Sequence, residues 1–183
     1  MGQYYKTVIE DRCGKFATLY THDYDNGLKL MEHSYVGNEY VNAVVTAIKS
    51  RGVCRVAHMG DYSDDYDKVR NKRMRDTFYR KAWGKNREIY LIRPEPQMSG
   101  DDVYIVNHDK KEYVRFMWDD PRANHWVNAI MLLLAVGNGL GGGDYHGKNM
   151  GLVGRWAFDR IEVCDEEPED CLKIHGWEFK EDY

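Results

Sequence analysis

The sequence predicts an α+β fold in a single domain that spans residues 1–183. A chain of 183 residues with 43% hydrophobic and 13% aromatic content can bury one core, but it is too short for two large domains. Short strand-like runs and amphipathic segments follow one another without the regular strand–helix–strand order of a parallel α/β protein. We therefore expect a compact α+β domain with short mixed strands, two hairpins and three to four helices.

The N-terminal elements begin with a hairpin. Residues 3–9 and 16–21 have strand character, and the turn between them contains Gly14, as tight turns often do. A turn-rich loop follows, after which residues 28–35 are predicted to form a short helix.

A longer helix is predicted over residues 39–49. Its apolar residues recur at helical spacing, and Asn38 stands where a helix N-cap is favoured. After it, residues 53–58 are expected to form a buried strand. Residues 68–83 are predicted to form a basic helix with a narrow apolar stripe.

The second half repeats the mixture of strands and helices. Residues 103–107 and 112–116 are predicted to pair as a second hairpin across a short charged turn. The other expected elements are a strand over 88–92, a helix over 124–136, one long strand over 152–163 and a last edge strand over 174–179.

An internal echo suggests a pseudo-two-fold repeat. Residues 38–44 align with residues 124–130, and a Gly-Asp-Tyr tripeptide follows each, at 60–62 and at 143–145. A duplication would give two hairpin–helix–loop halves with equivalent Asp-Tyr loops. Two amphipathic helices with similar core residues and a chance tripeptide would give the same pattern.

Charge is distributed unevenly along the chain. The net charge of −4 and the pI near 6.0 argue against a generally basic nucleic-acid binder and against a heavily acidic DNA mimic. Residues 68–87 nevertheless hold nine basic side chains against Asp76 alone, and residues 162–183 hold nine acidic side chains against two lysines. The basic segment also contains aromatic residues. In nucleic-acid binding proteins, basic side chains of this kind bind the phosphate backbone and aromatic rings stack on the bases.

This basic segment is the predicted binding surface for a partner or a nucleic acid. Its candidate contact residues are Arg73, Tyr79, Arg80, Lys81, Trp83 and Lys85. The alternatives are a solvated helix face, or a basic and an acidic patch that dock on each other.

Neither end of the sequence nor its interior suggests a membrane. No apolar run approaches the length of a membrane span, and residues 1–6 form no apolar signal region. We expect the protein in the cytoplasm. Its four cysteines form no C-x-x-C pair and are expected as reduced thiols, although a bridge between Cys164 and Cys171 is conceivable.

Six glycines fall within residues 137–147, a density that costs backbone entropy. The loop lacks the endings of a P-loop and of a dinucleotide-binding turn, so it names no ligand. We expect it to be ordered. The repeat hypothesis predicts a shared surface that is made of Asp61, Tyr62, Asp144, Tyr145 and His146.

The sequence assigns no catalytic residue, cofactor or metal site. Aspartates and histidines in the loops at 22–25, 61–67 and 144–146 could supply metal ligands, but their spacing matches no known cage. No histidine has a nucleophile partner at a recognisable spacing, and His58 is interpreted as a hydrogen-bonded structural residue in an apolar strand. A metal-dependent hydrolase or nucleotide-binding enzyme, built on these loops and the glycine loop, remains the alternative to a binding protein.

Six segments together have a recognisable pattern: Met1–Lys6, His22–Asn38, Gly60–Tyr62, Tyr104–Val114, Gly137–Tyr145 and Leu152–Ala157. They resemble a family of small proteins that phages, plasmids and their Clostridia-type or actinobacterial hosts carry. The similarity extends nearly from end to end and is weakest over the basic segment 68–87.

Most members of this family have no assigned activity, and one branch resembles anti-CRISPR proteins that inhibit the type II CRISPR effector nuclease. The resemblance implies a binding protein in the cytoplasm of a host bacterium. Its expected partners are the CRISPR effector nuclease and, with it, the guide RNA or the target DNA.

Overall fold

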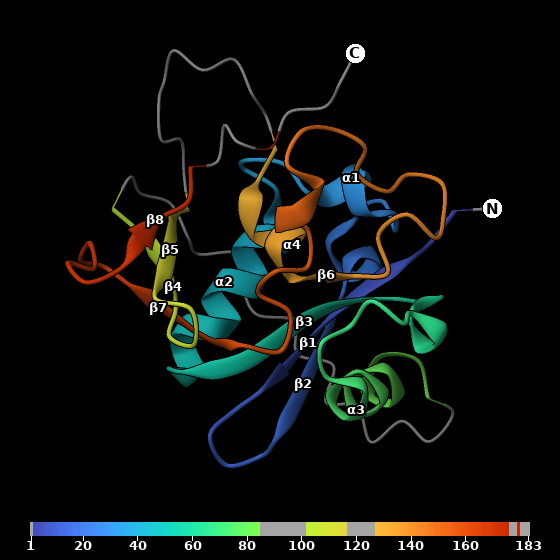
Figure 1. Cartoon of the computed structure of the whole chain (residues 1–183), viewed down its shortest axis with the longest axis horizontal. Coiled ribbons are helices and arrows are strands. Elements are labelled where there is room, and N and C mark those ends of the chain that lie inside the picture. Colours follow the sequence, from blue (N-terminus) through green and yellow to red (C-terminus); the bar gives the residue numbers. More distant parts are fainter. Residues whose placement is uncertain (1, 85–101, 117–126, 176–178, 180–183) are drawn as a thin grey trace.

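Eight strands form one mixed sheet in the computed structural model, which describes residues 2–84, 102–116, 127–175 and 179 (Figure 1). Seven of them follow the order β2-β1-β3-β7-β4-β5-β8, and the short β6 pairs with β3. The strands are β1 (Tyr5–Glu10), β2 (Phe16–Tyr20), β3 (Cys54–Gly60), β4 (Tyr104–Asn107), β5 (Glu112–Arg115), β6 (Ala135–Val136), β7 (Arg160–Cys164) and β8 (Leu172–Lys173). The β3–β6 and β5–β8 pairs are parallel, and the other pairs are antiparallel.

Four α-helices and three short 3-10 helices complete the described part of the chain. The α-helices are α1 (Leu30–His33), α2 (Glu39–Arg51), α3 (Lys72–Trp83) and α4 (Ala129–Leu134). The 3-10 helices are Thr21–Tyr24, Ser63–Asp65 and Met150–Leu152. The predicted α+β class is therefore confirmed, and so are both hairpins, β1–β2 and β4–β5.

The sheet is covered on both faces because its strands alternate in side-chain direction. Tyr5 and Ile9 of β1 point into the core beneath α2 and α4. Val8 of β1 and Met59 of β3 point to the opposite face, where Phe78 of α3 packs on them. In Figure 1, α3 accordingly lies apart from α2, across the strands β1 and β3.

Helix α3 is capped at its start and held on the sheet at its end. Asn71 caps its start, since the side-chain oxygen accepts from the Met74 N–H at 3.1 Å. At the other end the ammonium of Lys6, from β1, donates to the carbonyl of Ala82 at 3.2 Å and lies 4.1 Å from the Trp83 ring centroid. A lysine at this end also opposes the partial negative charge of the helix C-terminus.

The long strand predicted over 152–163 is wrong in its first half. Only Arg160–Cys164 forms a strand, because the preceding backbone turns away from the sheet. The N–H groups of Gly154 and Trp156 instead donate to carbonyls of α4, at 2.8 Å each, and Gly154 has a φ of +76°. The apolar residues of this run are buried by the turns that they form, and not by strand pairing.

The helix predicted over 124–136 is shorter in the structure, and this leaves the pseudo-repeat unconfirmed. Asn38 caps α2, but α4 begins four residues later in the alignment, with Asn128 as its cap. Asn128 aligns with Asn42, which lies inside α2, and Asn124 lies outside the described residues. The two segments thus begin their helices at different positions.

Other predicted elements differ mainly in length. The helices predicted over 28–35 and 68–83 shrink to α1 and α3, and β8 lies just before the predicted edge strand. The strand predicted over 88–92 falls outside the described residues. All four cysteines are free thiols, and within the described ranges no helix has the length and apolar character to cross a bilayer.

Candidate binding site

The outer face of α3 displays part of the predicted binding surface. The side chains of Arg73, Asp76, Tyr79 and Arg80 surround a shallow hollow of about 480 Å³. Arg73 and Arg80 are exposed, and the Arg80 Nε–H donates only to the Asp76 carbonyl of the same helix, at 3.2 Å. The structure therefore brings three of the six predicted contact residues together.

Lys81, Trp83 and Lys85 do not join this hollow. The Lys81 ammonium lies 4.9 Å from the centroid of the Phe16 ring, at the side of the helix. Lys85 lies outside the described residues. The indole N–H of Trp83 donates to the Met59 carbonyl at 3.2 Å, so this ring holds α3 on the sheet and does not project from it.

The basic and acidic patches do not dock on each other in the described part of the chain. Helix α3 packs over β1, β2 and β3, at one end of the sheet. The acidic turn at 165–170 connects β7 to the edge strand β8, at the other end (Figure 1). The exposed arginines of α3 are thus left for solvent or a partner.

The glycine loop is ordered and is organised around a buried carboxylate. Asp144 is 3% exposed, and one of its oxygens accepts from the N–H groups of Gly139, Leu140 and Gly141 at 2.7–3.1 Å. Its other oxygen accepts from the Tyr5 hydroxyl at 2.8 Å. Both carboxylate oxygens of Asp144 therefore accept hydrogen bonds from the protein, and the loop is a structural element around the start of β1.

The predicted surface of Asp61, Tyr62, Asp144, Tyr145 and His146 is not formed as expected. Tyr145 is buried like Asp144, whereas Tyr62 and His146 are exposed. Burial raises the pKa of Asp61, and the charge of Asp144 raises it further. The two Asp-Tyr segments thus meet around the start of β1, where Asp61 accepts from the Tyr4 N–H and Asp144 accepts from the Tyr5 hydroxyl. Two of the five residues, Asp144 and Tyr145, are however buried and cannot reach a ligand.

A chain of buried side chains runs beneath α2 and centres on two histidines. The Nε2 atoms of His33 and His58 lie 2.8 Å apart. Since His33 Nδ1 faces the carbonyl of Gly27 at 3.0 Å, Nδ1 carries the His33 proton and Nε2 accepts from His58. His58 Nδ1 then accepts from the Thr7 hydroxyl at 2.9 Å, and Thr7 accepts from Tyr40 at 2.7 Å.

This chain is satisfied only when both rings are neutral. Burial lowers the pKa of His33 to about 4, and burial together with the neighbouring His33 lowers the pKa of His58 well below its ordinary value. A proton added to His33 Nε2 would set two N–H groups against each other, and a proton added to His58 Nδ1 would face the Thr7 hydroxyl proton. The interpretation of His58 as a structural, hydrogen-bonded histidine is therefore confirmed.

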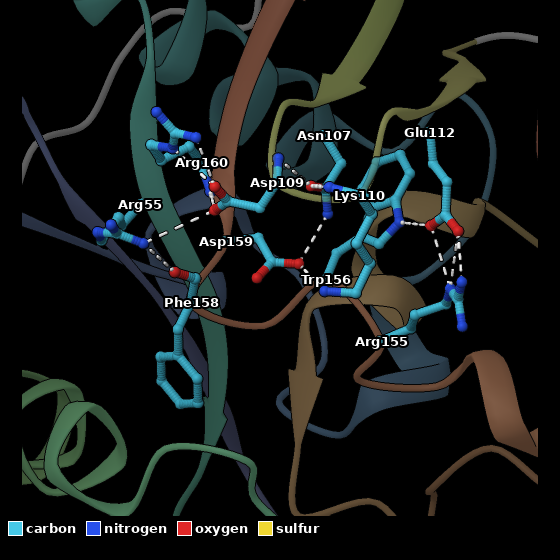
Figure 2. A network of polar contacts seen from close by, with 10 residues as sticks. All are labelled: Arg55, Asn107, Asp109, Lys110, Glu112, Arg155, Trp156, Phe158, Asp159 and Arg160. Atoms are coloured by element: carbon cyan, nitrogen blue, oxygen red, sulfur yellow. Dashed lines mark hydrogen bonds and ion pairs between the residues drawn. The ribbon is translucent and has the colours of Figure 1, made fainter. Parts of the chain in front are cut away.

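A network of ion pairs joins the β4–β5 turn to the segment before β7 (Figure 2). Glu112, at the start of β5, accepts from the Trp156 indole at 2.8 Å and from two nitrogens of Arg155 at 2.5–3.1 Å. Burial raises the pKa of Glu112, but these hydrogen bonds outweigh burial and hold the pKa below its ordinary value. The pair is therefore ionised at neutral pH, with Arg155 held at the surface.

Two further carboxylates extend the network toward β3. Asp159 pairs with Lys110 and accepts from the Asn107 amide at 2.9 Å. Asp109 pairs with Arg160 at 2.7 Å, and the guanidinium of Arg55 lies 3.8 Å from it (Figure 2). Both carboxylates are thus occupied by cations and are not available as free general bases.

This network forms one wall of the larger hollow, an open cleft of about 890 Å³. The segment that leads into α3 and the 150–154 turn also line this cleft. The polar and charged lining residues are Arg55, Lys68, Arg70, Asn71, Asp109, Lys110, Asn138, Arg155 and Asp159. Basic side chains outnumber acidic ones in this cleft, although the chain as a whole is acidic.

Sequence reasoning missed this cleft. Lys110 and Glu112 lie in the segment 104–114, and Arg155 and Trp156 in the segment 152–157, both of which carry the family resemblance. The spacing of these four residues in the sequence does not indicate that the two segments lie together in the fold. In the ranges that the structure describes, no three His, Cys, Asp or Glu side chains gather as metal ligands.

Comparisons with known proteins identify no relative. No protein-family model matches the sequence, no curated protein matches it, and no solved structure matches the fold.

Proposed function

We propose that this protein acts by binding, as an inhibitor of a type II CRISPR effector nuclease in the cytoplasm of a host bacterium. The observation that carries the proposal is the outer face of α3. This helix presents Arg73 and Arg80 to solvent while its other face is packed on the sheet, its start is capped by Asn71 and its end is held by Lys6 of β1. The family resemblance supplies the partner.

The chemistry of such a partner suits this face. A guide-loaded nuclease exposes phosphates of guide RNA and of target DNA, which attract arginine side chains and release counterions on contact. Because the arginines project from an anchored helix, little conformational entropy beyond that of their own side chains is lost on binding. Inhibition then follows from occupancy, without a catalytic step.

The test compares two variants with the same change in charge. Arg73→Glu/Arg80→Glu alters the α3 face, and Lys15→Glu/Lys148→Glu alters exposed lysines elsewhere on the surface. Each protein is mixed in several-fold excess with guide-loaded type II nucleases and target DNA, and cleavage and co-elution are measured over a range of salt concentrations. We expect the native protein and the lysine variant to inhibit and the arginine variant to lose inhibition.

Two results would contradict the proposal. Undiminished cleavage without co-elution, across a panel of type II nucleases, removes the assigned partner. Equal inhibition by the arginine variant at every salt concentration removes α3 as the interface, because exposed charges that contact phosphates must show a salt-dependent loss.

A further inference from the structure

We propose that the cleft between the α3 approach and the 150–159 segment binds a nucleoside phosphate, either as a free nucleotide or as one unit of a single-stranded nucleic acid. The inference is independent of the proposed function, because its residues are separate from Arg73 and Arg80 on the outer face of α3. It rests on the size of the cleft, on its charge and on its apolar floor.

The size suits a ligand of this class. Pockets for small molecules and cofactors typically enclose several hundred to about 1,000 Å³. The cleft measures about 890 Å³ and opens to solvent between walls that come from separate parts of the chain. It can therefore accept a base, a sugar and a phosphate together.

The cleft carries excess positive charge. With the partners that pair into its wall, it holds six basic side chains against three acidic ones. The basic residues are Arg55, Lys68, Arg70, Lys110, Arg155 and Arg160, and the acidic residues are Asp109, Glu112 and Asp159. On a chain with a net charge of −4, this excess marks the cleft as a place where an anion is attracted.

The excess is concentrated on two side chains. Each of the three carboxylates already has a basic partner, in the pairs that Figure 2 draws. Lys68 and Arg70 are exposed and make no ion pair or hydrogen bond with any residue that the structure describes. The neighbouring Asp67 pairs with Lys72 at 2.8 Å. Lys68 and Arg70 are thus ready to bind a phosphate without breaking an existing contact.

The start of α3 reinforces this wall. Its N-cap, Asn71, lines the cleft, and the first turn of the helix contains no acidic residue. Partial positive charge at a helix start favours a nearby anion. Lys68, Arg70 and the helix start therefore attract a phosphate from the same side.

The floor of the cleft suits the flat body of a base. This floor is the apolar and aromatic part of the lining, which includes Tyr66, Met74, Val153 and Phe158. The exposed Met150 stands at the rim and is flexible enough to fold over a ring. A purely inorganic anion would leave this floor uncovered, so the lining favours an organic phosphate.

The experiment titrates the full chain by calorimetry with adenosine monophosphate, adenosine and inorganic phosphate as probes. We expect the nucleotide to bind more tightly than either adenosine or phosphate, because only the nucleotide uses both the wall and the floor. Lys68→Glu/Arg70→Glu should weaken nucleotide binding at least about tenfold, equivalent to about 1.4 kcal/mol. The matched control Arg73→Glu/Arg80→Glu should bind as the native protein does.

A second variant blocks the space instead of the charge. Gly151 lines the cleft, and a Cβ added there meets no atom within 4 Å. Gly151→Phe should therefore leave the thermal unfolding midpoint unchanged and abolish nucleotide binding. A short oligoadenylate identifies the source: tighter binding than the mononucleotide indicates a strand, and equal or weaker binding indicates a free nucleotide.

Three outcomes would overturn the proposal. These are no heat of binding at millimolar nucleotide, equal affinity for adenosine and its monophosphate, and native affinity in both the charge variant and Gly151→Phe. Circular dichroism of each variant shows that it is folded before it is titrated, so a loss of binding is not a loss of structure.

Discussion

The buried pair His33 and His58 should make the stability of this protein fall steeply in mild acid. The two rings share one hydrogen bond, at 2.8 Å, which a proton on His33 Nε2 would break, and a proton on His58 Nδ1 would oppose the Thr7 hydroxyl that donates to it. In the unfolded chain each ring binds a proton near its ordinary pKa of about 6.5. In the folded chain burial lowers the pKa of His33 to about 4, and the pKa of His58 is lowered as well.

The sign and size follow from proton linkage. Because the folded pKa lies below the unfolded value, the stabilising contribution is complete above about pH 6.5 and is lost as the pH falls toward about 4. For His33 the window of about 2.5 pH units corresponds to about 3 kcal/mol, at roughly 1.4 kcal/mol per unit. With His58 taking part, the slope can approach two protons, or roughly 2.7 kcal/mol per pH unit.

Urea unfolding at a series of pH values between 7.5 and 5 measures this slope. The carboxylates with lowered pKa, Asp109 and Glu112, add their own loss only below their ordinary range near pH 4, so the histidine contribution stands clear of them. The control His146→Gln, at an exposed position, should keep the native slope. A flat free energy of unfolding between pH 7 and 5, or an unchanged slope in His33→Gln/His58→Gln, would refute the reasoning.

The remaining predictions concern the glycine loop and the ion-pair network, and urea unfolding at pH 7.5 checks each. Gly143→Val should cost more than about 1 kcal/mol because Gly143 has a φ of +80°, whereas Gly142→Val, at an ordinary φ, should cost clearly less. Asp144→Ala should lower the free energy of unfolding by about 3 kcal/mol, because three backbone N–H groups lose their acceptor. A decrease of less than about 1 kcal/mol would show that water replaces the carboxylate. Glu112→Ala should cost roughly 2 kcal/mol because the buried Trp156 indole loses its acceptor, and Glu112→Gln should recover about half; equal losses in the two variants would contradict that role.

The elements that the sequence predicted well are those specified by local chemistry. Asn38 caps α2 through hydrogen bonds to residues two and three positions later, at 2.8 and 3.2 Å. The hairpin turn of β1–β2 uses Gly14 at a φ of +73°. In both cases the residue type and its immediate neighbours decide the conformation, so a short window of sequence carries the information.

The segment 152–163 shows where such a window fails. Trp156 and Phe158 are buried, as strand residues would be, but the N–H of Phe158 donates to the Val56 carbonyl and that of Trp156 to the Leu133 carbonyl. An apolar pattern in the sequence indicates which residues are buried. It does not indicate which distant carbonyl accepts the hydrogen bond of a backbone N–H. The glycine loop gives a second example. Gly143 has a positive φ and Gly142 does not, but the run of glycines in the sequence does not indicate which of the two adopts it.

The cleft was beyond sequence reasoning for a similar reason. Its wall depends on Glu112 and Trp156, which are 44 residues apart in the chain and share a hydrogen bond of 2.8 Å. Its unpaired cations belong to the basic segment 68–87, which the sequence did identify. Composition thus indicated that this segment binds anions, but only the fold separates the residues that line the cleft from those on the outer face of α3.

The distribution of charge decides how a phosphate-bearing partner meets this protein. At physiological ionic strength interactions between exposed charges are screened beyond about 8 Å, so a partner senses the local field and not the net charge of −4. The acidic turn at 165–170 lies at the end of the sheet away from α3, where it repels phosphates without cancelling the arginines. Among the described residues, the exposed arginines of α3 and the acidic turn at 165–170 lie at opposite ends of the sheet, so lowering the salt strengthens both the attraction of a phosphate to the arginines and its repulsion by that turn. The salt concentration therefore alters the orientation in which a partner approaches as well as the rate of association. Because the lysine variant has the same net charge as the arginine variant, it is the proper reference for the effect of removing the arginines.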